Sequence, residues 1–378
     1  MAEIEQLVEG LRRDHPELEA IAAASRGPVF VVGGAVRDRL LGRDRADLDV
    51  VVVGDAAALA RSLGVEPLAE HARFATAKVE LQGHEVDLAT ARTETYARPG
   101  ALPEVAPAAS IEADLGRRDF TINAMALPLQ GPAELVDPHG GRADLGSGRL
   151  RVLHAGSFAD DPTRAIRAAR YAARFGFELE PETARLLRAA DLRTVSEDRR
   201  LGELRRLAAE PNAVRGLELL AEWGLVRPRE GGLALARRAD GLLGGEAWRG
   251  QVDRAAALLA AALGPAGAET GLARRRPSRP SQAVALARGR DPVELLLARA
   301  LGAEWLDSYL LEWLQVRLEI DGADLIAAGV GEGPAVGRGL RAALDAKLDG
   351  ELSGREAELE RALAAAGADG EEDDGGGI

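Results

Sequence analysis

Two aspartates with one residue between them, Asp47 and Asp49, open an apolar stretch that ends at Val53. The valines of this stretch are typical of a buried strand. Side chains alternate across a strand, so both carboxylates face the same side, about 7 Å apart. Like charges this close repel each other, and the arrangement is costly unless cations lie between them. Mg²⁺ prefers oxygen ligands such as carboxylates. We therefore predict that Asp47 and Asp49 bind Mg²⁺ in a site for metal-dependent nucleotidyl transfer.

A glycine pair, Gly33 and Gly34, lies between an apolar strand expected over 29–32 and a short helix expected over 35–41. A backbone without Cβ atoms can approach a phosphate closely, and the start of the following helix attracts anions. A glycine turn can also be purely structural, and an Asp-x-Asp pair can be solvated or can cap a helix. The glycine pair and the aspartate pair follow each other within one short segment, and this order favours a combined phosphate and metal site.

A third carboxylate, Asp87, lies in the second strand of a hairpin expected from 71–81 and 84–91, with its turn at Gln82 and Gly83. If Asp87 faces the same side as the aspartate pair, it supplies a third metal ligand. A solvated aspartate at a strand edge is the alternative, and both interpretations stay open.

Polar residues interrupt the helical pattern that is expected from 112 to 127. They are too polar for the packed face of a helix. They could contact a ribose and a triphosphate, or they could form a surface turn. The residues concerned are Arg117, Arg118, Asp119 and Asn123.

Arginines follow one face of the helix that is expected between Asp161 and Gly176. Asp160 or Asp161 can cap this helix, Pro162 suits its first turn and Gly176 ends it. At 100° per residue, an arc of roughly 120° bordered by Asp161 holds four arginines. They are Arg164, Arg167, Arg170 and Arg174. Such a face suits an anion or a nucleobase, and an exposed basic face is the alternative.

The composition excludes several classes of function. The 378 residues include no Cys, which excludes disulfides, thiolate metal sites and a cysteine nucleophile. The net charge of −13 argues against non-specific nucleic-acid binding by the whole surface, although a local basic groove is compatible with it. No apolar run reaches the roughly 18 residues of a membrane span, and the N-terminus is unlike a signal peptide. We expect a cytoplasmic protein with no membrane partner.

The strand pattern is confined to the first part of the chain. The other elements expected there are a helix over 3–25, a helix over 56–63, a long loop over 98–110 and turns with short strands over 135–153. The rest of the chain has a helical period near 3.6, with a loop over 264–280 and a disordered end.

Four blocks, in order over about residues 28–210, resemble those of the bacterial class II tRNA nucleotidyltransferases. These are the CCA-adding enzymes, which are related to bacterial poly(A) polymerases. The blocks are GGAVRDRLLG with DLD, RRDFTINA, DDPTRAIRAARYAARFGF and the segment SEDRRLGEL at 196–204. The second is the most specific. Asp160 and Asp198 stand where the family has Glu; both changes keep the charge, so they bear on local packing more than on activity.

The resemblance implies a role for each matching residue. Gly34 and Arg37 would hold the triphosphate, with Gly33 also part of the nucleotide site, and Asp47 and Asp49 would bind two Mg²⁺ ions. Arg118 would contact the nucleotide, and Asp119 and Asn123 would recognise the ribose 2′-hydroxyl. The base would be read by Asp161 and Arg164, with Arg167 and Arg170 beside them.

The resemblance also implies the fold, which is α+β. A polymerase-β-like nucleotidyltransferase head with a mixed sheet would be followed by an elongated all-α neck, body and tail. The predicted limits are 1–150 for the head, 151–215 for the neck, 216–300 for the body, 301–365 for the tail and 366–378 for a disordered end. The implied reaction adds C and A from CTP and ATP to the 3′ end of the tRNA acceptor arm and releases pyrophosphate.

The chemistry of Asp161 and Arg164 agrees with that reaction. Cytosine and adenine both present an amino donor beside a ring-nitrogen acceptor, which match an acceptor-only carboxylate and a donor-only guanidinium. Uracil and guanine reverse the pattern. Enzymes that add only CC, only A or poly(A) are alternatives within the class, and the oligomeric state is left open. A non-catalytic RNA-binding homologue and a dinucleotide-binding Rossmann module are alternatives outside it, although the sequence lacks the G-x-G-x-x-G pattern of the latter.

Overall fold

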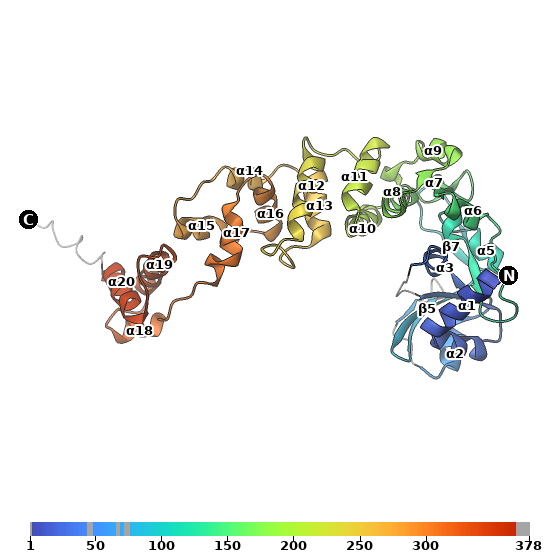
Figure 1. Cartoon of the computed structure of the whole chain (residues 1–378), viewed down its shortest axis with the longest axis horizontal. Helices are drawn as coiled ribbons and strands as arrows, with labels where there is room; N and C mark the ends of the chain where they lie inside the picture. The colour runs from blue at the N-terminus through green and yellow to red at the C-terminus, as the bar shows by residue number, and fades with distance from the viewer. Residues whose placement is uncertain (1, 44–47, 66–68, 72–75, 368–378) are drawn as a thin grey trace, which may run out of the picture. The chain divides into compact units, whose positions relative to one another are not determined.

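The computed structural model describes residues 2–43, 48–65, 69–71 and 76–367. The chain divides into two compact units, Met1–Val226 and Arg227–Ile378 (Figure 1). The first contains a mixed sheet and the second is built of helices, so the predicted α+β class is confirmed. The finer limits at 150, 215, 300 and 365 stay predictions. In the part of the chain that the structure describes, no helix is long and apolar enough to cross a membrane.

Six strands form the main sheet, in the order β3-β4-β5-β2-β1-β8. They are β1 (Val29–Val32), β2 (Leu48–Val52), β3 (Ala69–His71), β4 (Thr76–Leu81), β5 (His84–Thr90) and β8 (Ala126–Pro128). Strands β2 and β5 are parallel, and the other neighbouring pairs are antiparallel. A Rossmann module would have a mostly parallel sheet of repeated βαβ units, so that alternative is wrong.

Burial explains why β1 and β2 lie inside the sheet. Every residue of β1 is buried, and Asp49 is the one residue of β2 that is only partly buried. The predicted hairpin turn is confirmed, because Gln82 and Gly83 have φ of 53° and 84°. Positive φ at both central residues is typical of the two-residue turns that match the twist of a hairpin.

The N-terminal helix that was predicted over 3–25 is two helices, α1 (Ala2–Asp14) and α2 (Glu17–Ala24). Pro16 separates them, because proline has no N–H to donate and restricts the residue before it. The next two helices follow the prediction closely. They are α3 (Gly34–Leu40) and α4 (Ala56–Ser62).

Two predictions between residues 98 and 127 are wrong. The predicted loop contains β7 (Glu104–Pro107), which pairs with β6 (Arg92–Thr95) in an antiparallel ribbon. The predicted helix is reduced to α5 (Ile111–Leu115) and the 3₁₀ helix η2 (Thr121–Asn123), after which β8 begins. Packing decides the outcome, because β8 is buried beside β1 and this outweighs a local helical pattern.

The rest of the first unit is mainly helical, and α10 and α11 pack against α8. Pro162 occupies the N-cap position of α8, one residue later than the predicted cap, although Asp161 Oδ1 still accepts a hydrogen bond from the Thr163 N–H at 3.0 Å. Gly176 ends the helix, as predicted, with φ of 72°. The elements are α6 (Gly141–Gly146), β9 (Arg149–Leu150), α7 (Ser157–Asp160), α8 (Thr163–Phe175), β10 (Glu178–Leu179), α9 (Pro181–Leu187), η3 (Leu192–Thr194), α10 (Glu197–Ala208) and α11 (Ala213–Glu222).

In the second unit, part of the loop predicted over 264–280 is helix α14. Residues 366 and 367 of the predicted disordered end belong to α20, and the remainder of that end lies outside the described residues. The elements are α12 (Gly232–Leu243), α13 (Arg254–Leu263), α14 (Ala268–Ala273), α15 (Pro280–Ala287), α16 (Pro292–Ala300), α17 (Trp305–Leu311), η4 (Trp313–Gln315), α18 (Gly322–Ala327), α19 (Pro334–Leu348) and α20 (Arg355–Gly367).

Candidate active site

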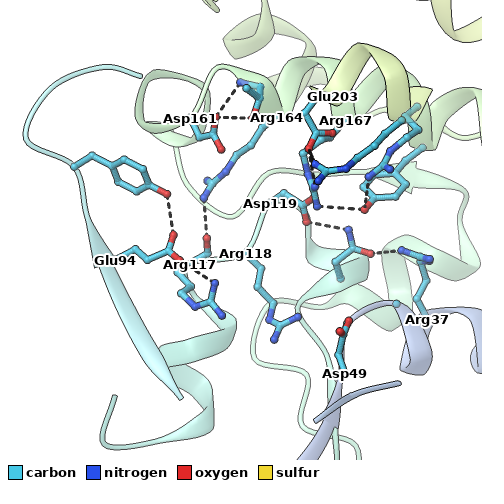
Figure 2. Close-up of a pocket in the computed structure, with 18 residues that line it drawn as sticks. Arg37, Asp49, Glu94, Arg117, Arg118, Asp119, Asp161, Arg164, Arg167 and Glu203 are labelled. Carbon is cyan, nitrogen blue, oxygen red and sulfur yellow. Dashed lines mark hydrogen bonds and ion pairs between the residues drawn. The ribbon is translucent and has the colours of Figure 1, made fainter. Parts of the chain in front are cut away.

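A polar cavity of about 610 Å³ in the first unit is lined by residues of the sheet, of α8 and of α10 (Figure 2). Every described residue that was predicted for the site lines this cavity, except Asp87. They are Gly33, Gly34, Arg37, Asp49, Arg118, Asp119, Asn123, Asp161, Arg164, Arg167 and Arg170. Arginines outnumber carboxylates in the lining by seven to five, which suits a polyanion such as a triphosphate.

The glycine turn allows an arginine to approach the backbone closely. Gly33 has φ of 66°, in the left-handed region that glycine adopts without strain. A Cβ on Gly33 would lie 2.7 Å from Arg118 Nη1, so a larger residue would displace the guanidinium. Arg118 is held from its other side by Asp114, whose Oδ2 accepts a hydrogen bond from Nη2 at 3.0 Å. The turn and Arg118 therefore form one wall of the cavity.

Asp49 and Asp87 lie side by side, in register, on the parallel strands β2 and β5. Neighbouring residues in register project from the same face of a sheet. Asp87 lines an adjoining cavity of about 430 Å³ that Asp49 also lines. Because β5 is an inner strand, Asp87 does not lie at an edge of the sheet.

Carboxylates on one sheet face form a donor set that fits Mg²⁺. The other half of the predicted pair, Asp47, lies outside the described residues. Among the residues that are described, no group of three or more His, Asp or Glu could hold a metal ion. The metal roles of Asp47, Asp49 and Asp87 therefore stay predictions.

Asp119 is at the centre of a buried hydrogen-bond network. Its Oδ1 accepts hydrogen bonds from the Phe120 N–H at 2.8 Å and from Asn123 Nδ2 at 2.9 Å. Its Oδ2 lies 2.7 Å from Arg167 Nε and 2.6 Å from Arg167 Nη2. Burial disfavours the charged form, but the charge of Arg167 and the hydrogen bonds from Asn123 and Arg167 outweigh it and lower the pKa of Asp119 to about 2. Asp119 is therefore ionised at neutral pH.

Asp161 and Arg164 line the same cavity as Asp49. Asp161 Oδ1 accepts hydrogen bonds from Thr163 and from Arg199 Nη2, the latter at 3.0 Å. In the described part of the chain, the side-chain hydrogen bonds to Asp161 all end on Oδ1, so its Oδ2 can accept a hydrogen bond from a ligand. The Arg164 guanidinium donates to Ser157 Oγ at 2.6 Å and to the Arg117 carbonyl at 2.7 Å. It is only 5% exposed, and these two bonds fix its plane while leaving other N–H groups for a base.

Glu94 and Tyr96, for which no role was predicted, also line the cavity. The Tyr96 hydroxyl donates to Glu94 Oε2 at 2.9 Å, and Arg117 Nη1 lies 3.0 Å from Glu94 Oε1. Burial, together with the charge of Glu94, raises the pKa of Tyr96. Arg92, Glu94 and Tyr96 are alternate residues and share a face in an extended segment, which is the signal that could have found them.

Two lining residues of α10, Glu203 and Arg206, were also missed. Glu203 Oε1 lies 3.5 Å from Arg167 Nη1 and 2.5 Å from Arg206 Nη1. Glu203 belongs to the block at 196–204, so the resemblance contained the signal, although no role was derived from it.

The family model for the poly(A) polymerase head domain matches residues 29–151. An alignment with the CC-adding tRNA nucleotidyltransferase of Deinococcus radiodurans is 38% identical over 334 residues and covers 82% of each chain. An A-adding tRNA nucleotidyltransferase of Halalkalibacterium halodurans is 42% identical over 230 residues, 56% of this chain. The chain spans about half of that relative's length, 53%.

Solved structures are similar over nearly the whole chain. The Thermotoga maritima CCA-adding enzyme complexed with tRNA has a TM-score of 0.75 and 28% identity, over 96% of this chain and 98% of that one. A complex of a CCA-adding enzyme with CTP has a TM-score of 0.79 and 28% identity, with the same coverage. Together with the Deinococcus alignment, these similarities assign this chain to the family of bacterial tRNA nucleotidyltransferases and poly(A) polymerases.

Proposed function

We propose that this protein adds C and A from CTP and ATP to the 3′ end of tRNA and releases pyrophosphate. One observation carries the proposal: the carboxylate of Asp49 and the Asp161–Arg164 pair line a single cavity. Nucleotidyl transfer needs a metal-binding acid beside the phosphates and a polar pair beside the base. The names of the relatives, with CTP and tRNA as bound molecules in two similar structures, support the same activity.

In the reaction, the 3′-hydroxyl of the tRNA attacks the α-phosphorus of the nucleotide. A new P–O bond forms, and the bond to pyrophosphate breaks. Arg118 beside the Gly33–Gly34 turn would hold the triphosphate, and Asn123 would contact the ribose. Asp47 and Asp49 would hold Mg²⁺, with Asp87 as a third candidate. When bound, Mg²⁺ would activate the attacking oxygen and neutralise charge on the leaving group.

Base choice would come from Asp161 Oδ2, which accepts from an amino group, and from Arg164, which donates to a ring nitrogen. UTP and GTP would set a carbonyl against the carboxylate and an N–H against the guanidinium. Leaving a buried charged group without its partner costs on the order of 2–5 kcal/mol, a discrimination of about 30-fold to several thousand-fold. Arg167 and Arg170 lie on the same face of α8 and would favour the triphosphate electrostatically.

Addition of CC without A is the second candidate function. It is favoured by the alignment with the CC-adding enzyme of Deinococcus radiodurans, which covers 82% of both chains. Because tRNA, CTP and ATP occur together in the cytoplasm, we propose that the protein acts there.

The test is incubation of the protein with radiolabelled CTP or ATP and tRNA transcripts that lack CCA, CA or A. A CCA-adding enzyme extends all three transcripts to the same length. A CC-adding enzyme extends the first two with C and leaves the third unchanged. Absence of any incorporation with Mg²⁺ present would contradict the proposed function.

A further inference from the structure

We infer that Ser157 is a positioning residue, which fixes the guanidinium of Arg164 relative to the carboxylate of Asp161 and thereby sets how strictly the enzyme selects C and A. The inference rests on the proposed function, in which Asp161 and Arg164 read the base. It makes the selectivity of that pair depend on a third residue that does not touch the nucleotide.

Ser157 is the first residue of helix α7 and is 0% exposed. It does not line the cavity that Asp161 and Arg164 line. Its Oγ accepts a hydrogen bond from Arg164 Nη1 at 2.6 Å. Any effect of the serine hydroxyl on a bound nucleotide must therefore pass through Arg164.

Ser157, Asp161 and Arg164 are joined in a closed ring of hydrogen bonds. The Asp161 N–H donates to the Ser157 carbonyl at 3.3 Å, and the Arg164 N–H donates to the Asp161 carbonyl at 3.0 Å. The Arg164 guanidinium closes the ring at Ser157 Oγ. The two backbone bonds fix where the side chains begin, and the bond to Oγ fixes where the guanidinium ends. The spacing between the carboxylate and the guanidinium therefore depends on the serine hydroxyl.

The guanidinium of Arg164 has a second tether, because its Nη2 donates to the Arg117 carbonyl at 2.7 Å (Figure 2). A single hydrogen bond would leave the planar group free to rotate, whereas bonds from two of its nitrogens fix the plane. Arg164 is only 5% exposed, so removal of Ser157 Oγ would also leave a buried, charged N–H group without its partner.

A fixed guanidinium excludes uracil and guanine because it cannot move away from the ring N–H that these bases set against it. A guanidinium held only by the Arg117 carbonyl can rotate and donate to the neighbouring carbonyl oxygen of the base instead. The free-energy penalty against UTP and GTP would then fall. Removal of the Ser157 hydroxyl should therefore weaken base selection and leave Mg²⁺ binding unchanged.

The experiment replaces Ser157 with alanine, which removes the hydroxyl, and with cysteine, which has a similar volume but accepts hydrogen bonds only weakly. Both variants are assayed with CTP and with UTP on a tRNA transcript lacking CCA, over a Mg²⁺ titration. In Ser157→Ala, we expect the kcat/KM for UTP relative to CTP to rise about tenfold, because a hydrogen bond from a charged group is lost. Ser157→Cys should lie within about twofold of Ser157→Ala. The Mg²⁺ concentration for half-maximal activity should not change.

A double variant tests whether Ser157 acts through Arg164. If it does, Ser157→Ala combined with Arg164→Ala has the same base preference as Arg164→Ala alone, because the two residues share one interaction. Ser281→Ala is the matched control. Its hydroxyl also forms a side-chain hydrogen bond, to Asp349 Oδ2 at 2.8 Å, but Ser281 does not line the cavity. This control should leave base preference unchanged.

The inference is overturned if Ser157→Cys selects bases as the wild type does while Ser157→Ala does not, since the serine would then act through its volume alone. It is also overturned if both variants keep the wild-type base preference, or if the effects of Ser157→Ala and Arg164→Ala multiply. If Ser157→Ala does not fold, Ser157→Cys provides the test, because cysteine fills the same space. A wild-type enzyme that incorporates no nucleotide would instead contradict the proposed function.

Discussion

Asp49 on β2 pairs in register with Asp87 on β5, so two carboxylates that are 38 positions apart in the sequence project from one face of the sheet. The pairing depends on the parallel contact of β2 and β5, which the hairpin between β4 and β5 makes possible. The carboxylates border two adjoining cavities, and Asp49 lines both. A metal ion beside Asp49 would therefore lie where the two cavities meet.

If Asp87 is a third metal ligand, Asp87→Asn should reduce turnover about 10- to 100-fold and raise the Mg²⁺ concentration needed for half-maximal activity. Asp49→Ala, which removes a predicted principal ligand, should abolish turnover. The measurement is CTP incorporation over a Mg²⁺ titration. Glu85→Gln, an exposed residue of the same strand that lines neither cavity, is the control. A wild-type Mg²⁺ dependence in Asp87→Asn would remove Asp87 from the metal site.

Asp161→Asn should relax base choice without unfolding α8. Asparagine keeps the oxygen that caps the helix, but an amide donor replaces the acceptor Oδ2. Use of UTP relative to CTP should rise by about 30-fold or more, while the Mg²⁺ dependence stays unchanged. Asp161→Ala should relax base choice as well, and should also lose about 1 kcal/mol of stability with the cap. Continued rejection of UTP by both variants would show that another residue reads the base.

Asp119 should stabilise the fold over the whole neutral range. Its pKa is lowered from 3.8 to about 2. Its stabilisation, about 2 kcal/mol, is therefore fully present above pH 3.8 and is lost as the pH falls through the folded pKa. The difference in free energy of unfolding between wild type and Asp119→Asn should stay constant from pH 8 to pH 5 in urea titrations. The same difference should shrink as the pH falls from about 4 to about 2, and a difference that stays constant over that window would mean that the pKa of Asp119 is not lowered.

Gly33→Ala should impair both the fold and the site. The combination of φ of 66° with ψ of −122° is a conformation that costs alanine on the order of 1–3 kcal/mol, and the new methyl group displaces Arg118 from the turn. We expect the KM for CTP to rise about tenfold or more, because a contact from a charged group is lost. Gly131→Ala is the control, with φ of 78° and no atom within 4 Å of the added Cβ. Equal KM values in the two variants would rule out a role for the Gly33–Arg118 contact.

The sequence predicted the elements whose causes are local. Valines and leucine predicted β1 and β2, a turn pair predicted the β4–β5 hairpin, and an aspartate followed by Pro162 predicted the start of α8. The boundaries of these elements differ from the prediction by a few residues at most.

Elements that depend on contacts distant in sequence were not predicted. The segment before Leu127 has a helical pattern, but its end lies in strand β8, because β1 offers a partner and a buried position. The ion pair of Glu94 with Arg117 was likewise not predicted, because Arg117 comes from another part of the chain. For the same reason, the burial of Arg37 between two aromatic rings of α8 could not be read from the sequence around Arg37.

The central claim is that nucleotide transfer and base selection take place in the same cavity. The most direct measurement supplies all four nucleoside triphosphates at equal concentration, with Mg²⁺ and a tRNA transcript lacking CCA, and determines the sequence of the nucleotides added. We predict that the wild-type protein adds only C and A, and that Asp161→Asn adds U or G as well. Addition of all four nucleotides by the wild type, or of only C and A by Asp161→Asn, would contradict the claim.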